Sequence, residues 1–241
     1  MLKQISIFIR SLLFFIFTVT TISAYSILCV CSLPFPLRYR SGLIRAYLRF
    51  FIIVLKKLCH IDYHIEGLEN IPKNQAVIIM SKHQSTWETF FLPTIFHDPA
   101  IILKRELLWI PFFGWGLAAS DPIAINRQAG SSAMQQIITK GRKCLEEGRS
   151  ILVFPEGTRI PAGQIGKFRR GGVVLAANTG YPIIPVAHNA GRFWPRRQFL
   201  KRPGTIQVVI GPLIPTQRRT PEEILRITQQ WMVETMARID G

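Results

Sequence analysis

The first apolar stretch of the chain is long and free of charge. Between Arg10 and Arg38 lie 27 residues without a charged side chain, including the apolar runs 12–17 and 22–30. A helix rises ~1.5 Å per residue, so about 20 helical residues cross the hydrocarbon core of a bilayer. A cleaved signal peptide is the alternative, but its apolar region is normally only ~7–15 residues long. The pattern therefore favours an uncleaved membrane anchor.

A second pattern follows over residues 38–58, where apolar positions recur at helical spacing and basic residues interrupt them. The apolar positions are Leu43, Ile44, Tyr47, Leu48, Phe51, Leu55 and Leu58, and the basic ones are Arg45, Arg49, Lys56 and Lys57. Such a basic amphipathic helix suits a membrane interface. Pro34 and Pro36 break the chain between the two helices, so we expect a two-helix membrane anchor over residues 1–60. Basic residues flank the first helix on both sides, which leaves open whether it spans the bilayer or lies in one leaflet.

The remainder, residues 61–241, has the pattern of a globular domain from about Ile65 onwards. Short apolar runs predict strands at 76–80, 100–103, 122–125, 151–154, 183–186 and 206–210. Helical stretches are predicted between them, at 86–96, 131–147, 170–178 and 221–239. This alternation predicts an α/β fold with a mixed, mostly parallel central sheet flanked by helices. The Pro- and Arg-rich segment 193–204 is predicted to be an exposed loop.

Charge narrows the choice of partner. The 241 residues include 30 Lys and Arg against 14 Asp and Glu, a formal net charge of +16. Residues 1–61 carry eight basic residues and residues 157–221 carry eleven, and neither stretch contains an acid. Such blocks suit a phospholipid surface, a phosphorylated substrate, an acidic protein or a nucleic acid. A hydrophobic content of 48% excludes intrinsic disorder, and the single long apolar segment excludes a multi-span transporter.

One histidine stands where α/β sheets place their sites. His83 follows a predicted strand and precedes a predicted helix, so it lies at the carboxyl edge of the sheet. Glu88, five residues later, can reach an imidazole nitrogen of His83 only if the helix begins after His83, and Ser85 is a suitable N-cap for that start. A carboxylate so placed fixes the tautomer and raises the basicity of the other nitrogen. The alternative is structural: Ser85 and Glu88 also form a capping-box pattern.

Three further segments carry candidate chemistry. Directly after a predicted strand, the sequence Phe154-Pro155-Glu156-Gly157-Thr158-Arg159 offers a glycine for close approach, a hydroxyl and a guanidinium suited to phosphate. Lys104, Arg105 and Arg127 fall just beyond two other predicted strand ends and suggest a site for a phosphorylated substrate. An ordinary turn and solvated loop charges are the structural alternatives. The apolar stretch 181–186, bounded by prolines, is more typical of a core strand than of a site.

These segments, in this order, resemble the 1-acylglycerol-3-phosphate acyltransferases, the PlsC-like glycerolipid acyltransferase family. The matching residues, over about 65–215, are His83 and Glu88, then Lys104, Pro111, Gly114 and Arg127, then Phe154 to Arg159, then Ile184, Pro185 and Val186. The first family block is a histidine followed after four residues by aspartate, and this chain has Glu88 in the aspartate position. The family commonly has an N-terminal membrane anchor, in some members two helices that dip into a single leaflet.

The resemblance implies transfer of an acyl group to the free glycerol hydroxyl of lysophosphatidic acid. His83 would be the general base and Glu88 would orient it. Arg159, with Gly157, Thr158 and the family-matched Glu156, would form the phosphate site together with Lys104, Arg105 and Arg127. Acyl-CoA or acyl carrier protein would be the donor, without a cofactor and without nucleic acid. The protein would be associated with the inner membrane, with its active site facing the cytoplasm.

Composition and motifs leave little room for metal chemistry. Neither an H-E-x-x-H sequence nor a cysteine pair of zinc-ligand spacing occurs, and no G-x-S-x-G elbow suggests an acyl-serine intermediate. The four cysteines do not form a disulfide pattern, which indicates a reducing compartment for the catalytic part.

Three alternatives to this function remain at the level of sequence. The acceptor could be another lysolipid, such as a lysophospholipid with a head group or lyso-ornithine lipid. The chain could be a thioesterase-like hydrolase that releases the acyl group without an acceptor. It could also be a membrane-anchored lipid or nucleic-acid binder without catalysis, although no nucleic-acid motif is present and His83 and Glu88 would then have no role.

Overall fold

The computed structural model describes residues 2–240 and is built on one seven-stranded sheet. The strands are β1 (Ile61–Glu66), β2 (Ile78–Ser81), β3 (Ala100–Lys104), β4 (Ile123–Ile125), β5 (Ile151–Val153), β6 (Ile183–His188) and β7 (Gly204–Ile210). The α-helices are α1 (Leu2–Cys31), α2 (Leu37–Cys59), α3 (Trp87–Ile95), α4 (Phe113–Ala118), α5 (Ser131–Glu146), α6 (Gly171–Thr179) and α7 (Pro221–Asp240). The strand order is β1-β7-β6-β2-β5-β3-β4.

The sheet is mixed and mostly parallel, as the alternation of strands and helices predicts. Five neighbouring pairs are parallel, and only β6 and β7 run antiparallel. The central strands β2, β5 and β6 are buried on both faces, which accounts for their continuous apolar sequences. The parallel strands β6, β2, β5, β3 and β4 are neighbours, so their carboxyl ends lie along one edge of the sheet.

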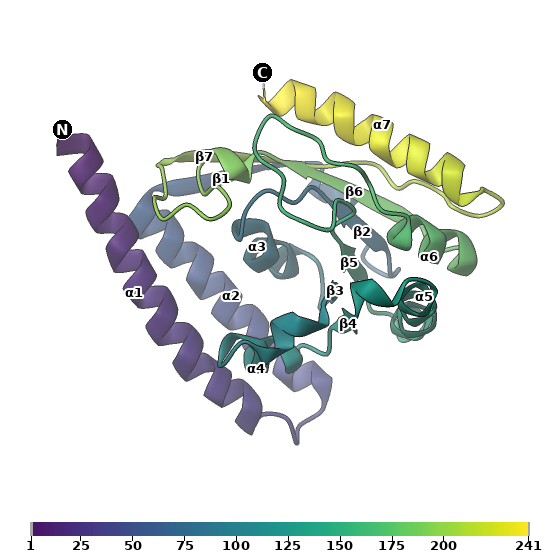
Figure 1. The fold of residues 1–241 in the computed structure, drawn as a ribbon, viewed down its shortest axis with the longest axis horizontal. Helices are drawn as coiled ribbons and strands as arrows, with labels where there is room; N and C mark the ends of the chain where they lie inside the picture. Colours follow the sequence, from purple (N-terminus) through teal and green to yellow (C-terminus); the bar gives the residue numbers. More distant parts are fainter. Residues whose placement is uncertain (1, 241) are drawn as a thin grey trace.

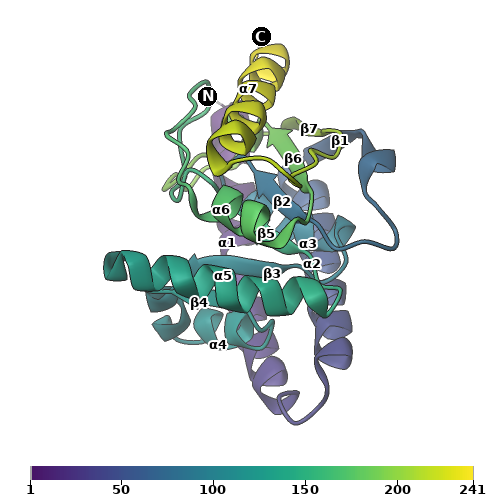
Figure 2. The same ribbon diagram turned by 90° about the vertical axis from the view of Figure 1, so that its right-hand side faces the viewer.

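Helices cover both faces of the sheet, and each face has its own hydrophobic core. Ile78 and Met80 of β2 point into the core that α5, α6 and α7 cover, whereas Ile79 points into the core beneath α2 and α3. This alternation is the two-residue period of a strand. Figure 2 shows α5 and α6 in front of the sheet, with α1 and α2 behind it.

The two N-terminal helices form an antiparallel hairpin on one flank of the sheet (Figure 1). Phe14 of α1 and Phe51 and Leu55 of α2 are fully buried in the same core as α3. The ring of Phe51 stacks on Phe90 of α3, with ring centroids 4.2 Å apart. α2 ends at Cys59 and β1 begins at Ile61, and α2 shares its core with the sheet.

The pattern of elements differs from the predicted one in two places. The edge strand β1 was not expected, because its sequence alternates polar and apolar residues and its partner β7 lies more than 130 residues away. The short helix α4 lies in the connection between β3 and β4, where the sequence pattern assigns no helix. The helix after β2 begins at Trp87 with Thr86, and not the predicted Ser85, at the N-cap position, although the Trp87 backbone N–H donates to the Ser85 hydroxyl at 3.2 Å.

Candidate active site

The carboxyl edge of the sheet brings together segments that are far apart in the sequence. The loop after β2 carries His83, and the loop after the adjacent parallel strand β5 carries residues 154–159. The backbone N–H of Ile160 donates to the carbonyl of His83 at 2.8 Å, which joins the two loops. β6, the other neighbour of β2, ends in His188. The candidate site is therefore assembled by the order of the parallel strands.

His83 and Glu88 form a direct pair. The Nδ1 atom of His83 lies 2.8 Å from Oε1 of Glu88, and the same oxygen accepts the backbone N–H groups of Gln84 and Ser85 at 2.9 and 2.8 Å. A carboxylate oxygen only accepts, so Nδ1 carries the proton and Nε2 is left as the basic nitrogen. Glu88 is fully buried, whereas the side chain of His83 is 14% exposed. The capping and orienting roles of Glu88 are thus served by one oxygen.

The charge on Glu88 is stabilised despite its burial. Burial alone would raise the pKa of this carboxyl, but the imidazoles of His188 and His83 and the backbone N–H of Ser85 hold the pKa below its usual value. Glu88 is therefore ionised at neutral pH. An ionised carboxylate at this position stabilises positive charge on His83.

A buried ion pair between Lys82 and Glu156 fixes the backbone of His83. The Nζ atom of Lys82 lies 2.6 Å from Oε1 of Glu156, and both side chains are fully buried. Glu156 also accepts the backbone N–H of His83 at 3.1 Å and that of Gly166 at 2.7 Å. Both oxygens of Glu156 therefore bind groups of the protein itself. Its carboxylate fixes the position of His83 relative to the segment after β5.

The rest of the segment after β5 packs around the imidazole. The ring of Phe154 stacks on His83 with ring centroids 4.1 Å apart and an interplanar angle of 19°. Gly157 adopts φ +68°, and a Cβ there would lie 2.8 Å from Nε of Arg169. Only glycine combines this conformation with so close an approach. Arg127 donates to the carbonyl of Gly157, which brings this predicted residue to the loop.

The guanidinium of Arg159 interacts electrostatically with the carboxylate of Glu88. Burial lowers the pKa of its half-buried guanidinium, the charge of Glu88 raises it, and Arg196 lowers it, with a net downward shift. Its backbone carbonyl accepts a hydrogen bond from Arg196 at 3.1 Å. Arg159 thus adds positive charge to the segment whose next residue, Ile160, hydrogen-bonds the His83 carbonyl.

Other predicted site residues lie farther out. Thr158 is exposed beside Arg159. Lys104 ends β3 with its Nζ 3.8 Å from Glu106, and the guanidinium of Arg105 lies 5.7 Å from the ring centroid of Trp109. Within residues 2–240, no hydrogen bond or ion pair joins Lys104 or Arg105 to the His83 loop.

A second histidine, which the sequence reading missed, lies behind the pair. His188 is fully buried; its Nε2 lies 2.8 Å from the carbonyl of Lys82 and 3.9 Å from Oε2 of Glu88. Its Nδ1 accepts the backbone N–H of Ala190 at 3.3 Å, so Nε2 carries the proton. Burial lowers the pKa of His188 more than Glu88 raises it, and this ring is neutral at neutral pH. It ties the end of β6 to the loop that carries His83.

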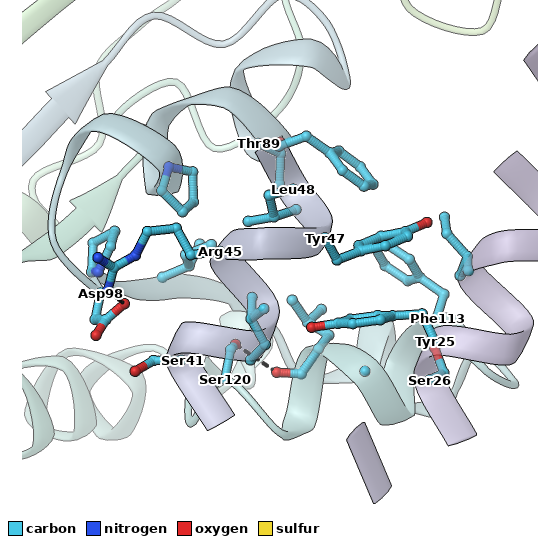
Figure 3. Close-up of a pocket in the computed structure, with 18 of the residues that line it drawn as sticks. Tyr25, Ser26, Ser41, Arg45, Tyr47, Leu48, Thr89, Asp98, Phe113 and Ser120 are labelled. Carbon is cyan, nitrogen blue, oxygen red and sulfur yellow. Dashed lines mark hydrogen bonds and ion pairs between the residues drawn. The ribbon is translucent and has the colours of Figure 1, made fainter. Parts of the chain in front are cut away.

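An apolar cavity lies between α3 and the helices α1, α2 and α4. Figure 3 shows it beside Tyr25, Tyr47, Leu48 and Phe113, and its volume is about 120 Å³. The Arg45–Asp98 ion pair, with 2.6 Å between Nη2 and Oδ1, closes one end. Thr89, the residue after Glu88, also lines it. A mostly apolar cavity next to α3 suits a hydrocarbon chain.

This arrangement is suited to general-base catalysis on a hydroxyl. It combines an imidazole whose Nε2 is left as the basic nitrogen, a buried carboxylate on Nδ1 and the arginine-bearing loop after β5, which is hydrogen-bonded to the His83 loop. No group of three or more His, Cys, Asp or Glu side chains within residues 2–240 is arranged to hold a metal ion. The proton acceptor that the geometry offers is therefore Nε2 of His83.

Comparison with known proteins identifies the class. The acyltransferase family model matches residues 62–189, which are just over half of the chain and include both loops of the site. The protein belongs to the acyltransferase family.

Its relatives narrow the class further. A 1-acyl-sn-glycerol-3-phosphate acyltransferase of Pseudomonas aeruginosa is 50% identical over 210 residues, which are 86% of this chain and 81% of that protein. A protein of the same name from Borreliella burgdorferi is 35% identical over 159 residues, which are 65% of this chain and 63% of that protein. The human 1-acyl-sn-glycerol-3-phosphate acyltransferase alpha is 28% identical over 179 residues, and the match spans 63% of its length.

A solved structure has the same fold along the whole chain. It is the 1-acyl-sn-glycerophosphate (LPA) acyltransferase PlsC of Thermotoga maritima, with a TM-score of 0.83 and 22% sequence identity. The match covers 99% of this chain and 98% of that one, so it includes the N-terminal helices. The mixed α/β architecture is confirmed. Among the described residues, α1 is the one helix long and apolar enough to cross a membrane, which indicates membrane association.

Proposed function

We propose that this acyltransferase moves a fatty acyl group from acyl-CoA or acyl carrier protein to the sn-2 hydroxyl of 1-acylglycerol-3-phosphate, forming phosphatidic acid. The observation that carries the proposal is the His83–Glu88 pair, whose 2.8 Å contact leaves Nε2 free at the edge of the sheet, on a loop joined by a hydrogen bond to the Arg159 segment. The printed names of the relatives support the acceptor.

His83 acts as the base in a direct transfer. Its Nε2 takes the proton of the acceptor hydroxyl as the oxygen attacks the thioester carbonyl carbon. The imidazolium that forms is stabilised by the buried carboxylate of Glu88. When the tetrahedral intermediate collapses, the C–S bond breaks and His83 returns the proton to the leaving thiolate. The products are the ester and the free thiol, and His83 is again neutral.

Arg159 binds the acceptor phosphate. In the acceptor, the phosphate is attached to the carbon next to the one that bears the attacking hydroxyl, so it must lie close to Nε2 of His83. The charge of Glu88 favours the protonated guanidinium of Arg159. Gly157 and Thr158 precede Arg159 on the same turn. Arg127 supports this turn through the carbonyl of Gly157, and Glu156 supports it from its buried side. Lys104 and Arg105 attract the anionic headgroup from the outer part of the same edge.

The apolar cavity between α1, α2, α3 and α4 holds an acyl chain. Its lining includes Thr89 and Phe90, which follow Glu88 in the first turn of α3. A chain in this cavity reaches the reacting carbonyl along the helix that positions the base. Because the cavity is apolar and α1 forms one wall, a lipid tail enters it from the side of the membrane anchor.

The anchor lies in one leaflet. α1 touches the domain near both ends: the Ser11 hydroxyl accepts the backbone N–H of Lys201 at 2.9 Å, and Ser26 packs against Gly116. A helix tied to the domain at both ends does not cross to the far side of the bilayer. Its outward face is apolar, with Ile16 and Ile27 each 53% exposed, and Trp109, just before α4, adds a 66% exposed ring. We place the domain on the cytoplasmic face of the inner membrane, where soluble acyl donors reach it.

Acceptor competition tests the proposal. Purified full-length protein in mixed micelles is offered a labelled acyl donor and equal amounts of 1-acylglycerol-3-phosphate and lysophospholipids that carry a head group. Preference for the phosphomonoester is expected, and Arg159→Ala should weaken it by raising the KM for that acceptor about tenfold or more. Equal use of a head-group lysolipid, or acyl release without any acceptor, would contradict the proposed function.

A further inference from the structure

A second cavity lies between the segment that follows the Arg159 turn and the loop between β6 and β7. Its volume is about 370 Å³, within the ~300–1,000 Å³ range of ligand pockets. The lining residues are Gln84, Pro161, Ala162, Gly191, Arg192, Pro195, Arg196, Gln198 and Arg202. Gln84, the residue after the catalytic base, thus forms the floor of the cavity. The arginine-rich loop between β6 and β7 forms its rim.

The rim of this cavity is strongly cationic. Arg192, Arg196 and Arg202 are all exposed and all line it. Arg192 is partly neutralised by Asp240, with 3.2 Å between Nε and Oδ1. Within residues 2–240, no acidic side chain pairs with Arg196 or Arg202. Two guanidinium groups without an acidic partner, at the mouth of a cavity, are suited to a phosphate.

The floor of the cavity is polar and tightly constructed. Gln84 is 1% exposed; its Oε1 accepts the backbone N–H of Gly191 at 3.1 Å, while its Nε2 has no partner among the described residues. A Cβ on Gly191 would lie 2.9 Å from the Cβ of Gln84. The glycine therefore keeps the floor of the cavity close to the His83 loop, and an unpaired amide donor stands beside it.

The rim is held in place by the membrane anchor. Phe199, in the same loop, packs on Phe8 and Phe15 of α1 with ring centroids 5.6 and 5.9 Å apart. The ammonium of the buried Lys201 donates to the Phe199 carbonyl at 2.8 Å and lies 5.2 Å from the ring centroid of Trp194. The arginines are thus presented from an ordered loop rather than from a free one.

The position of this cavity matches the acyl donor better than the acceptor. The acceptor phosphate is adjacent to the reacting hydroxyl and is accounted for by Arg159. The donor phosphate, in both CoA and acyl carrier protein, is separated from the thioester sulfur by the whole pantetheine arm. The donor phosphate must therefore bind cations at the rim of the site, and a channel must lead from there to His83. The cavity runs from Gln84, beside His83, to the exposed arginines.

We propose that Arg196 and Arg202, with Arg192, bind the phosphate at the end of the donor's phosphopantetheine arm, and that the arm enters through the cavity above Gln84. The proposal rests on the acyl transfer proposed above. It assigns the phosphate that CoA and acyl carrier protein have in common, so it holds for either donor. Arg159 and the rim arginines then form two separate phosphate sites, one for each substrate.

The test uses Arg202→Glu in the full-length protein, with Arg219→Glu as a control that makes the same change of charge. Arg202 is chosen because Arg196 also holds the carbonyl of Arg159. Arg219 is exposed, donates to the Pro215 carbonyl and does not line the cavity. KM is measured for acyl-CoA, acyl carrier protein, acyl-phosphopantetheine and acyl-pantetheine, and separately for 1-acylglycerol-3-phosphate. Binding of CoA and of pantetheine is measured by calorimetry.

Arg202→Glu should raise the KM for the three phosphate-bearing donors on the order of tenfold and leave acyl-pantetheine and the acceptor unchanged. Arg219→Glu should change none of them. A raised acceptor KM with an unchanged donor KM would overturn the proposal in favour of an acceptor site. Weaker binding to anionic vesicles with unchanged donor KM would overturn it in favour of bilayer lipid. If the protein transfers no acyl group, the proposed function fails, and calorimetry still decides: CoA binding lost in Arg202→Glu supports the pocket, and unchanged binding rejects it.

Discussion

Replacing Glu88 by glutamine removes the charge behind His83 and changes little else. Gln keeps an oxygen that can accept from His83 Nδ1 and from the Gln84 and Ser85 backbone, where Glu88 now makes contacts of 2.8, 2.9 and 2.8 Å. The other end of the amide would place an NH₂ group near His188 Nε2, now 3.9 Å from Oε2 and itself a donor. The variant therefore holds the geometry with a neutral partner and one unfavourable contact.

The size of the expected fall in kcat follows from the positive charge that His83 acquires during the reaction. At the roughly 4 Å between the charge centres of such a pair, two unit charges interact by about 4 kcal/mol at an effective dielectric constant near 20. Losing this term only in the transition state lowers kcat about 1,000-fold.

The assay is single-turnover acyl transfer at saturating donor and acceptor, with thermal unfolding measured on the same samples. We expect a large fall in kcat with a small change in Tm and in acceptor KM. A Glu88→Gln enzyme with kcat within tenfold of the wild type would refute the orienting and charge-stabilising role of Glu88. A collapse of Tm would instead show that its main role is to cap α3.

Three further predictions concern the support of the site and the anchor. Glu156→Gln leaves Lys82 buried without a counter-charge, so the free energy of unfolding should fall by about 3–5 kcal/mol in a urea titration; normal stability with a raised acceptor KM would return Glu156 to direct substrate contact. Burial lowers the pKa of His188, so below about pH 6.5 the unfolded chain binds a proton at this residue that the folded chain does not. Tm should therefore fall from pH 6.5 to pH 5, and it should fall less in His188→Gln. Parallel Tm-against-pH profiles for the two proteins would contradict this. Ile16→Lys with Ile27→Lys should weaken vesicle binding at unchanged Tm, because both side chains point outward, and undiminished binding would show that α1 does not meet the lipid.

The layout of the fold was largely readable from the sequence because its central strands are buried on both faces. Such strands appear as short apolar runs, and six of the seven strands overlap a predicted run. The amphipathic α2 was equally clear. The edge strand β1 escaped detection because its sequence, Ile-Asp-Tyr-His-Ile-Glu, alternates and its pairing with β7 is long-range. The antiparallel direction of β7 relative to β6 likewise has no local signal.

Prediction of the candidate site was accurate for local geometry and incomplete for tertiary contacts. A helix start after His83 allows Glu88 to reach Nδ1, and that is the arrangement found. The role of Lys82 escaped notice, although it precedes His83, because a lysine is rarely buried and its partner Glu156 is 74 residues away. His188 falls at the end of a strand whose apolar run, as read from the sequence, stops two residues earlier. The only available signal for it was its place at the carboxyl end of the strand beside β2.

The packing of the predicted anchor could not be read from the sequence pattern. Residues 1–60 have the composition of a separate membrane element, yet Phe14, Phe51 and Leu55 are buried in a core that also contains Ile79 and Ile184 of the sheet. Hydrophobicity alone does not reveal which face of a helix meets lipid and which meets protein. That distinction depends on packing against α3, which the sequence does not encode locally.

The central claim is that Nε2 of His83 accepts the acceptor's proton in a direct transfer. Its most direct test is the transfer of a radiolabelled acyl group to 1-acylglycerol-3-phosphate by the wild type and by His83→Ala, in matched micelles and with equal folding shown by circular dichroism. The account predicts labelled phosphatidic acid from the wild type and a rate at least 1,000-fold lower from His83→Ala, on the order of the general-base and charge terms combined. Wild-type rates from the folded His83→Ala protein would contradict it.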